Sequence, residues 1–397
     1  MRILLINDYA TPNAGAEVMI LLLRNELRRR GHDARVFASR AQLIPGDSFA
    51  DYTCFGTTTR WQAVSSAFNV SAWWTLRRTL RSFRPDMVHV KMFLWQLSPA
   101  IMPLLRNTPS LYHIVTYKPV CPRGSKLLPD GSLCTFRAGV ACHSQGCLTA
   151  QSWVPMMAQR ILFRRWRSVF DAFITNSEAV RQRLVEEGVG PVQVLANGTL
   201  RRQQRPPLTG PPVLAYAGRL SAEKGVETLL HAFAGLKGSA QEARLWVAGD
   251  GPLSEPLRRV ANDLGISARV EFLGSLSREA LEARFDAAWA QIIPSLWEEP
   301  FGMVAIEAMM RGTAVIASNG GGLREIVRPG AGLLVPAGDV SALTEALREL
   351  VNDRTLCERM GDTGRRIALA EYTAESHADS IEAIYGRLIG ESSQGPA

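Results

Sequence analysis

Three absences limit what this sequence can be. No apolar run is long enough to span a bilayer, and the stretch of residues 1–8 is too short and ends too polar for a signal peptide. No Asp-x-Asp pair occurs, so the chain lacks the neighbouring carboxylates that clamp a divalent ion on a diphosphate. The loop after the first predicted strand is not a G-x-G-x-x-G turn, which disfavours a dinucleotide-binding dehydrogenase. We therefore expect a cytoplasmic protein that needs no metal ion for catalysis.

The composition is that of a globular protein, but the charge is unevenly divided. The 397 residues and 46% hydrophobic content fit two or three domains with sizeable cores. Residues 1–205 hold 27 Lys and Arg against 12 Asp and Glu, whereas residues 206–397 hold 18 against 25. The basic half is expected to attract a membrane surface, a lipid pyrophosphate carrier or an anionic glycan, unless it is simply solvated. Nucleic acid is disfavoured because no binding motif for it accompanies the charge.

Short apolar runs alternate with helical periods in both halves, which is typical of βαβ units with parallel sheets and helices on both faces. The first half predicts a helix over residues 16–30, closed by Gly31, and strands at residues 2–6, 35–38, 87–90, 112–116, 172–175 and 192–195. The second half predicts strands at residues 213–217, 244–248, 270–273, 288–294 and 314–317. Residues 201–207 lack apolar periodicity and end in prolines, so they are predicted to form a linker. The fold class is therefore α/β, with doubly wound sheets.

The most informative stretch lies between a predicted buried strand and an apolar helix. Glu299 falls in the connecting loop, and Glu307 lies about a turn inside the helix predicted over residues 302–310. Free N–H groups and the positive dipole end at a helix start suit a phosphate, and carboxylate oxygens suit the vicinal hydroxyls of a sugar. One loop could therefore hold both parts of a nucleotide sugar. A solvated helix face is the alternative for two glutamates at this spacing.

Several further motifs accompany Glu299-Pro300-Phe301-Gly302 and Glu307. They are Gly218-Arg219-Leu220 with Glu223-Lys224-Gly225, Gly249-Asp250-Gly251, Phe272-Leu273-Gly274, and Gly321-Gly322 with Glu325. The order and spacing of these motifs resemble those of the retaining glycosyltransferases of family 4, and the resemblance covers nearly the whole chain. The resemblance implies a GT-B fold, in which two Rossmann-like doubly wound domains have the active-site cleft between them.

The resemblance also implies roles for particular segments. Residues 1–205 would be the acceptor-side domain, residues 206–373 would bind the nucleotide sugar, and residues 374–397 would return to the first domain as a helix with a disordered tail. In such enzymes the second glutamate of the pair binds the ribose and the first approaches the donor sugar, here Glu307 and Glu299, with Glu298 as an alternative for the latter. The predicted substrate-binding residues are Gly15, Gly218, Gly249, Gly251, Gly274, Glu298, Pro300, Phe301, Gly302, Glu307, Gly321 and Gly322.

Arg219 and Lys224 follow the first strand of the second domain, where open α/β sheets bind their ligands. Transfer of a sugar leaves negative charge on the diphosphate, and without an Asp-x-Asp pair, protein cations and helix starts must neutralise it. The resembling enzymes contact the diphosphate at these two positions. Arg219, Lys224 and Glu299 are therefore the predicted catalytic residues, with a surface Arg and Lys in a turn as the alternative.

Two departures from the family pattern concern the first domain. In the loop that contains Gly15, Ala14 stands where a second glycine is usual, which limits backbone freedom. Val115 and Thr116 occupy the positions of a histidine and an aspartate found in a subset of the family, and His113 lies two residues earlier. Because that histidine contacts the donor sugar in the subset, its absence bears on sugar choice and on activity.

Four of the six cysteines fall within 27 residues, in a glycine-rich stretch without a helical or strand period. Cys121, Cys134, Cys142 and Cys147 could hold a structural zinc ion that orders the stretch, with His143 as a substitute ligand. The spacing lacks the paired C-x2-C of common zinc modules, so free buried thiols are the other interpretation.

The segment Arg160–Phe170 combines four arginines with bulky apolar residues, which suits contact with an anionic membrane. The apolar members also recur at core-facing helical spacing, which favours burial. These members are Ile161, Leu162, Trp166, Val169 and Phe170.

The sequence predicts a retaining, hexosyltransferase-like enzyme that moves a sugar from a nucleoside diphosphate to a hydroxyl of a glycan, lipid-linked or small-molecule acceptor, as in polysaccharide biosynthesis. Peripheral contact with the inner face of an anionic membrane is compatible with its basic half. One alternative is a non-catalytic sugar-nucleotide-binding subunit of a biosynthetic assembly, motivated by Ala14 and Val115. The other is a nucleotide-sugar epimerase on the same fold.

Overall fold

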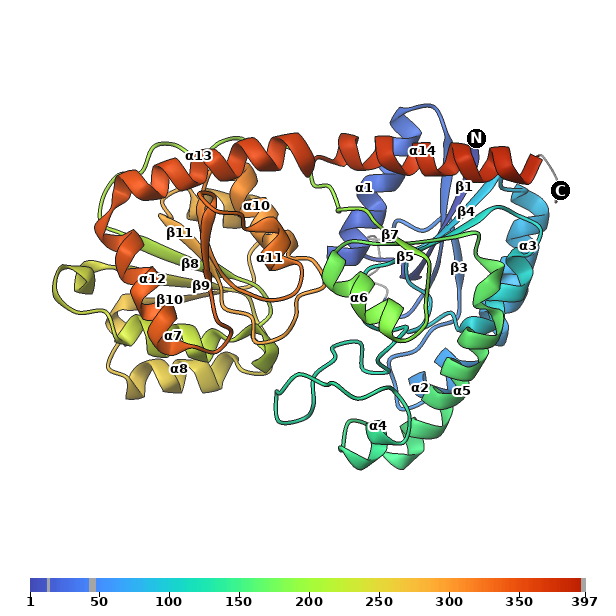
Figure 1. Ribbon diagram of the computed structural model, residues 1–397, viewed down its shortest axis with the longest axis horizontal. Helices are drawn as coiled ribbons and strands as arrows, with labels where there is room; N and C mark the ends of the chain where they lie inside the picture. The colour runs from blue at the N-terminus through green and yellow to red at the C-terminus, as the bar shows by residue number, and fades with distance from the viewer. Residues whose placement is uncertain (13–14, 43–47, 394–397) are drawn as a thin grey trace. The chain divides into compact units, whose positions relative to one another are not determined.

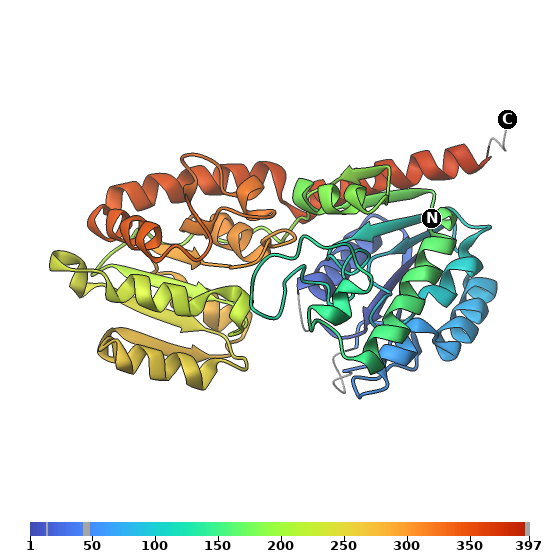
Figure 2. The ribbon, with the colours of Figure 1, turned by 60° about the horizontal axis from the view of Figure 1, so that its bottom comes forward.

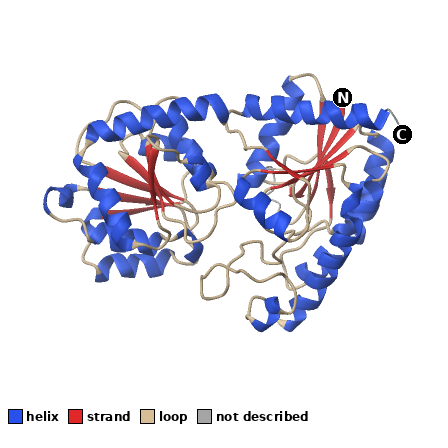
Figure 3. Ribbon diagram, viewed as in Figure 1, coloured by secondary structure: helices blue, strands red, loops and turns tan. Residues whose placement is uncertain are grey.

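The computed structural model describes residues 1–12, 15–42 and 48–393 (Figure 1). The chain divides into two compact units, unit 1 with Met1–Leu200 and Ala374–Ala397, and unit 2 with Arg201–Thr373. The predicted linker therefore begins unit 2. Figure 3 shows that each unit has a central sheet flanked by helices. Within the described ranges, no helix is both long enough and apolar enough to cross a bilayer.

The described strands of unit 1 form a seven-stranded parallel sheet in the order β3-β2-β1-β4-β5-β6-β7. Its strands are β1 Arg2–Tyr9, β2 Asp33–Ser39, β3 Tyr52–Cys54, β4 Met87–Val90, β5 Ser110–Ile114, β6 Ala172–Thr175 and β7 Val192–Val194. Its helices are α1 Gly15–Arg29, α2 Gln62–Ala67, α3 Val70–Phe83, η1 Pro99–Leu105, α4 Ala141–Ser144, α5 Ala150–Trp166, η2 Arg167–Val169, α6 Glu178–Glu186 and α14 Ala374–Ser393. The chain order reverses between β1 and β4, which makes their carboxyl ends the switch point where such sheets bind ligands.

Unit 2 repeats this plan, and its described strands form a six-stranded parallel sheet in the order β10-β9-β8-β11-β12-β13. The strands are β8 Val213–Ala217, β9 Arg244–Ala248, β10 Val270–Gly274, β11 Ala290–Ile293, β12 Ala314–Ser318 and β13 Gly332–Val335. The helices are η3 Ala222–Lys224, α7 Val226–Ala234, η4 Gly238–Glu242, α8 Ser254–Asp263, η5 Ser267–Arg269, α9 Arg278–Phe285, α10 Met303–Arg311, α11 Leu323–Ile326, α12 Val340–Asn352 and α13 Arg354–Glu371. Here the order reverses between β8 and β11.

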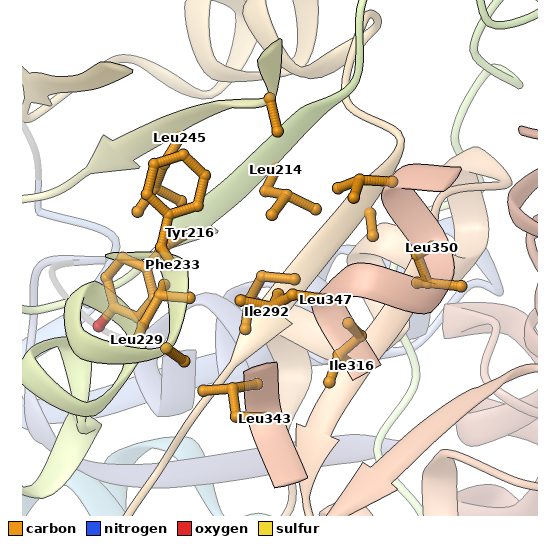
Figure 4. Packing of buried hydrophobic residues seen from close by; sticks show 14 of the residues in the cluster. Leu214, Tyr216, Leu229, Phe233, Leu245, Ile292, Ile316, Leu343, Leu347 and Leu350 are labelled. Atoms are coloured by element: carbon orange, nitrogen blue, oxygen red, sulfur yellow. The ribbon is translucent and has the colours of Figure 1, made fainter. Parts of the chain in front are cut away.

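The core of unit 2 lies between its sheet and the helices that cover it, α7 and α12 among them. Figure 4 shows strand residues such as Leu214 and Ile292 packed against Phe233 of α7 and Leu347 of α12. All four side chains are fully buried, and burying one such side chain contributes about 1.5–3 kcal/mol. This packing holds the sheet rigidly and leaves its carboxyl edge to the loops.

Helix α14 packs on unit 1, as Figures 1 and 2 show in red. Its residues Ala378, Ile381 and Ile384 join the buried cluster that contains Ile3 and Leu5 of β1. The predicted disordered tail, residues 392–397, begins inside this helix, since α14 continues to Ser393, and residues 394–397 lie outside the described residues.

The segment Arg160–Phe170 packs into unit 1, which confirms its predicted burial in part. Phe170 is buried, and Leu162, Trp166 and Val169 are half-buried. The core-facing placement of Ile161 is wrong, because α5 buries the stripe formed by Met156, Gln159 and Phe163, and Ile161 lies on the opposite side with 67% exposure. Two of its four arginines are also engaged, since Arg160 and Arg164 bind the buried carboxylate of Glu187.

Asp8 joins the two strand ends that flank the switch point of unit 1. It lies in β1, is fully buried, and accepts hydrogen bonds from the backbone N–H groups of Trp95, Gln96 and Leu97 at 2.9, 2.7 and 3.1 Å. These three residues belong to the loop that follows β4. Burial raises the pKa of Asp8 to about 6, against the lowering effects of the three N–H groups and of Lys118.

We predict that Asp8→Asn lowers the free energy of unfolding by about 1–3 kcal/mol, because the amide NH2 would face a buried backbone donor that the carboxylate now satisfies. Chemical denaturation followed by tryptophan fluorescence measures the change. Asp33→Asn is the control, since Asp33 pairs with Arg35 on the surface and its loss should change stability by well under about 1 kcal/mol. Equal effects of the two substitutions would contradict the assigned role of Asp8.

Candidate functional site

Unit 2 gathers the predicted site loops at one edge of its sheet. Because its described strands all run parallel, the loops after β8, β9, β11 and β12 leave from the same edge. Since β8 pairs with β11 and the chain order reverses between them, the loops that hold Lys224 and Glu299 flank the switch point. This edge is therefore the candidate site.

Lys224 and Glu299 form an ion pair across the switch point. The Nζ atom of Lys224 lies 2.6 Å from Oε1 of Glu299, and the hydroxyl of Ser295 donates to the same oxygen at 2.7 Å. Glu299 is 9% exposed and Lys224 is half-buried. The Lys224 ammonium also lies 5.2 Å from the centre of the Trp297 ring, which is a cation–π distance. The structure thus brings together two of the three predicted catalytic residues.

Glu299 is distinguished from the adjacent Glu298 by this contact. Glu298 is half-buried, and the contact with Lys224 is made by Glu299. The geometry therefore favours Glu299 for the position nearest the cationic loop.

Glycines allow the loops after β8, β9 and β10 to approach at backbone distance. A Cβ atom on Gly249 would lie 1.9 Å from the carbonyl oxygen of Gly218, and one on Gly251 would lie 2.4 Å from that of Leu220. The Gly249 N–H donates to the Gly274 carbonyl at 2.8 Å. These predicted binding glycines hold three loops together, and their contact with a substrate stays a prediction.

The loop after β12 encloses the Glu299 segment in the same way. A Cβ atom on Gly321 would lie 2.2 Å from the carbonyl oxygen of Glu299, and that oxygen accepts the Gly322 N–H at 2.8 Å. Pro300 and Phe301 are buried beside it, and Gly302 precedes α10. The backbone at Glu299 is therefore held in place by the loop after β12.

Positive charge at this edge is available to a ligand. Helix α10 starts after Gly302, which offers no capping side chain, so a ligand could accept from the first N–H groups of the helix. Arg219 is exposed, and its guanidinium makes no ion pair with any residue that the structure describes. Both groups suit a diphosphate.

Glu307 is half-buried on α10, about one turn from the helix start. Its Oε1 atom lies 3.6 Å from a guanidinium nitrogen of Arg278. Burial raises the pKa of Glu307, while Arg278 and Arg202 act in the lowering direction. The carboxylate is positioned by one arginine and keeps acceptor capacity for hydroxyl groups.

Sequence reasoning missed Arg278 and assigned no role to Ser295 or Trp297. Arg278 begins α9, a short, mostly polar helix with no motif around it. Ser295 and Trp297 stand within the motif itself, but a contact between side chains of one loop leaves no periodic pattern in the sequence.

In unit 1 the predicted glycine-rich loop is only partly visible, since residues 13 and 14 lie outside the described ranges. Gly15 is the first residue of α1, and Glu17 in the first turn is buried. Lys91 follows β4 and is 1% exposed, and its Nζ atom has no hydrogen-bond partner among the described atoms. Burial lowers the pKa of Lys91 to about 7, while Glu17 opposes this effect.

His113 is enclosed within unit 1. Its ring centre lies 5.5 Å from that of His89 and 5.8 Å from that of His377 on α14. Burial, with smaller contributions from Lys91 and the neighbouring histidines, holds the pKa of His113 well below its ordinary value. It is therefore a neutral, packed side chain and does not stand in for the family histidine absent at Val115.

The four clustered cysteines line one hollow. Cys121, Cys134, Cys142 and Cys147 surround it together with apolar side chains, and all four are free. Burial raises the pKa of Cys142 and that of Cys147, which favours neutral thiols. In the described part of the chain, no three His, Cys, Asp or Glu side chains are arranged to hold a metal ion. The side chains as placed do not form a zinc site.

Two models of known protein families match the chain, one in each half. The family model "Glycosyl transferase 4-like domain" matches residues 14–198, and "Glycosyl transferases group 1" matches residues 199–367. Alpha-D-kanosaminyltransferase of Streptomyces kanamyceticus is 30% identical over 180 residues, which cover 45% of this chain and 46% of that protein. The chain spans about half the length of the curated relatives it matches.

Solved structures of other proteins match nearly the whole length of this chain. Sucrose-phosphate synthase from Thermosynechococcus elongatus has a TM-score of 0.75 at 21% identity, covering 98% of this chain and 100% of that one. Anabaena HepE, solved in complex with UDP, has a TM-score of 0.69 at 19% identity, covering 98% and 100%. At these identities the likeness shows the fold, which is that of two Rossmann-like α/β units.

We predict that Gly249→Ala destabilises the protein by about 1–3 kcal/mol more than Gly265→Ala does, because an added methyl group would overlap the Gly218 carbonyl. Gly265 is a matched control, since its φ of +67° carries backbone strain but its Cβ would meet open space. Denaturation curves of the two variants measure the difference. Equal losses of stability in the two variants would show that the loops after β8 and β9 can move apart without cost. Their close approach would then not be needed for the stability of the fold.

Proposed function

The chain belongs to the group 1 glycosyltransferases, and we propose that it transfers a sugar from a nucleoside diphosphate to a hydroxyl group of an acceptor. Its two units have the Rossmann-like architecture of GT-B structures. The observation that carries the proposal is the ion pair of Lys224 and Glu299 at the switch point of unit 2. A charged pair at the ligand-binding edge of a sheet, beside an uncapped helix start, is suited to an anionic ligand with hydroxyl groups.

Arg219, Lys224 and the first N–H groups of α10 supply the positive charge for the departing diphosphate. In the proposed step, the bond between C1 of the sugar and the diphosphate oxygen breaks, and the acceptor hydroxyl oxygen bonds to C1 on the same face. The hydroxyl proton passes to the leaving phosphate oxygen. This route retains the configuration at C1 and requires neither a protein base nor a metal ion. Its rate depends on preorganised charge, which typically contributes several kcal/mol.

Glu307 and Glu299 divide the recognition of the donor. Glu307 accepts hydrogen bonds from the ribose hydroxyls, and Glu299 faces the sugar while Lys224 and Ser295 hold its carboxylate in place. That HepE was solved in complex with UDP supports a nucleoside-diphosphate donor. The glycines at positions 218, 249, 251, 274, 302, 321 and 322 shape the backbone around these groups.

We assign the acceptor to unit 1, where Gly15 begins α1 and the buried ammonium of Lys91 follows β4. A glycan, a lipid-linked sugar or a small hydroxylated molecule fits this proposal. The excess of basic residues in the first half favours an acceptor or a surface that carries negative charge. We expect the enzyme to work in the cytoplasm, in peripheral contact with the inner face of the membrane.

Product analysis tests the function directly. Nucleotide sugars are first screened for thermal stabilisation, since a ligand at 100 times its dissociation constant adds about 2.7 kcal/mol. The donor that binds is then incubated with and without a pool of acceptors. A new glycoside with retained configuration, formed only with an acceptor, is expected. Donor binding without turnover would indicate a binding subunit, and conversion of the donor sugar without an acceptor would indicate an epimerase.

We predict that Glu307→Ala weakens donor binding by about 10- to 100-fold, because ribose hydroxyls lose a charged acceptor worth about 1.5–3 kcal/mol. Isothermal titration calorimetry measures the dissociation constant of the donor, with Glu345→Ala on the exposed surface of α12 as the control.

The raised pKa of Glu307 also predicts that donor affinity depends on pH. Its carboxyl group protonates at a higher pH than that of an ordinary glutamate, so wild-type affinity should be lost as the pH is lowered, earlier than an ordinary glutamate would cause, and Glu307→Gln should remove that dependence. Unchanged affinity of the folded alanine variant would remove Glu307 from the site.

We predict that turnover survives EDTA, since protein cations replace a catalytic metal ion in the proposed step. Elemental analysis of protein purified without chelator tests the structural zinc separately. One equivalent of zinc would show that Cys121, Cys134, Cys142 and Cys147 rearrange around a metal, and much less than one equivalent would leave them as free thiols. Loss of activity in EDTA that Mg²⁺ or Mn²⁺ restores would contradict the metal-independent step.

A further inference from the structure

Unit 1 exposes large apolar side chains beside a group of arginines. Residues 52–85 contain five arginines and no aspartate or glutamate. Six apolar side chains in this range are 52–60% exposed, namely Phe55, Trp61, Val64, Phe68, Val70 and Trp74. We call these six residues, with Arg60, Arg77, Arg78 and Arg81, the aromatic-arginine surface. Soluble proteins rarely expose a continuous apolar patch of this kind without a binding role.

Nine of the ten members of this surface line two hollows. Five of the six apolar side chains, all except Trp74, line one open hollow on the outside of α2 and α3. Trp74 lies one turn beyond Val70 and lines a second hollow together with Arg77, Arg78 and Arg81. Figures 1 and 2 show α3 at the periphery of unit 1.

Helix α3 has two faces of different character. Its buried face, formed by Ala72, Leu76, Thr79 and Phe83, packs on unit 1. The opposite stripe carries Val70 and Trp74 in the first half of the helix and Arg77, Arg78 and Arg81 in the second. The solvent-facing stripe is thus apolar in its first half and cationic in its second half, which places aromatic and cationic side chains next to each other on one exposed surface.

Arginine and aromatic groups also meet in pairs on this surface. The guanidinium of Arg60 lies 5.5 Å from the Trp61 ring centre, and that of Arg77 lies 5.1 Å and 5.8 Å from the rings of Trp73 and Trp74. None of Arg60, Arg77, Arg78 and Arg81 forms an ion pair with a described residue. Their charges are therefore available to anions while the adjacent rings offer apolar area.

We propose that the aromatic-arginine surface binds the headgroup region of an anionic lipid bilayer. The tryptophan, phenylalanine and valine side chains enter the boundary between headgroups and acyl chains, and the arginines bind lipid phosphates. Charge complementarity selects this occupant, because a surface without any acidic residue needs a partner that supplies all the negative charge.

A second copy of the chain is a poorer partner for the same reason. A twofold interface places the same patch on both subunits, so the arginines of one would face the arginines of the other. Opposed like charges at an interface are unfavourable. The proposal is also independent of the donor site, since every residue of the surface belongs to α2, α3 and their flanking segments in unit 1.

Sedimentation with vesicles tests the proposal. The full chain is mixed with vesicles of equal parts phosphatidylcholine and phosphatidylglycerol, and separately with vesicles of phosphatidylcholine alone. We expect binding to the first set only, weakened when salt rises from about 0.1 M to about 1 M, which shortens the screening length from about 10 Å to about 3 Å. The triple variant Arg77→Gln, Arg78→Gln, Arg81→Gln should bind about 100-fold more weakly and depend less on salt.

A second variant separates the apolar contribution. Trp61→Ser with Trp74→Ser should also lower affinity, but should leave the salt dependence unchanged because all arginines remain. The matched control is Arg258→Gln, Arg359→Gln, Arg366→Gln, which removes the same charge from exposed arginines of unit 2 and should bind vesicles like the wild type. Circular dichroism and titration with the donor confirm that each variant is folded.

Three outcomes would overturn the proposal. They are no binding of the wild type to anionic vesicles, equal binding to neutral and anionic vesicles, or equal weakening by the control and the arginine variant. A concentration-dependent dimer that the tryptophan variant dissociates, without vesicle binding, would assign the surface to a second copy instead. Donor titration reports separately on the proposed transferase, so failure of either proposal is visible without the other.

Discussion

The carboxylate of Glu299 holds together groups from the two strands that flank the switch point of unit 2. Lys224 comes from the segment after β8, and Ser295 comes from the loop after β11. Parallel strands bring these loops to one edge, but strand direction alone does not fix their distance. A carboxylate can accept several hydrogen bonds at once, so one side chain can position both loops. Asp8 does the same at the switch point of unit 1 through three backbone N–H groups.

The two carboxylates differ in what they leave available. Asp8 is fully buried and satisfied by the backbone, so its role is structural. Glu299 is paired with a half-buried lysine, whose ammonium has three donors and can reach an incoming phosphate while Ser295 still holds the carboxylate. Removing either charge would leave the other without its partner in a partly desolvated place, which is costly. We propose that the ion pair holds the two loops when no donor is bound and rearranges when a donor binds.

The sequence predicts much of this because buried parallel strands are short, nearly continuous apolar runs. The bounds of β4, β6, β8 and β9 agree with the predicted ranges, and the comparisons confirm the predicted family resemblance and the two-unit α/β fold. Strands β3 and β13 have no predicted counterpart. The first has only three residues, and the second begins at a glycine and is mostly half-buried, so neither stands out as an apolar run. Strand β5 begins two residues earlier than predicted because Ser110, though polar, pairs with Val88.

Side-chain partners are harder to predict than strands. The motif places Lys224, Glu299 and Glu307 at strand ends and a helix start, but Arg278 meets Glu307 only through the packing of α9 beside α10. The aromatic-arginine surface is missed for a related reason, since a tryptophan at helical spacing is compatible with either a buried or an exposed face. The sequence instead suggests membrane contact at Arg160–Phe170, where the single carboxylate of Glu187 pairs with two of the arginines.

The central claim is that Arg219 and Lys224 together neutralise the departing diphosphate at the edge of unit 2. Turnover numbers of the wild type, Arg219→Ala, Lys224→Ala and the double variant test it most directly. Each single substitution should lower turnover by about 10²–10³, and the double variant should lose less than the sum of the two barrier increases, because both cations act on one developing charge. Near-wild-type turnover in either folded single variant would show that the diphosphate is neutralised elsewhere and would contradict this account.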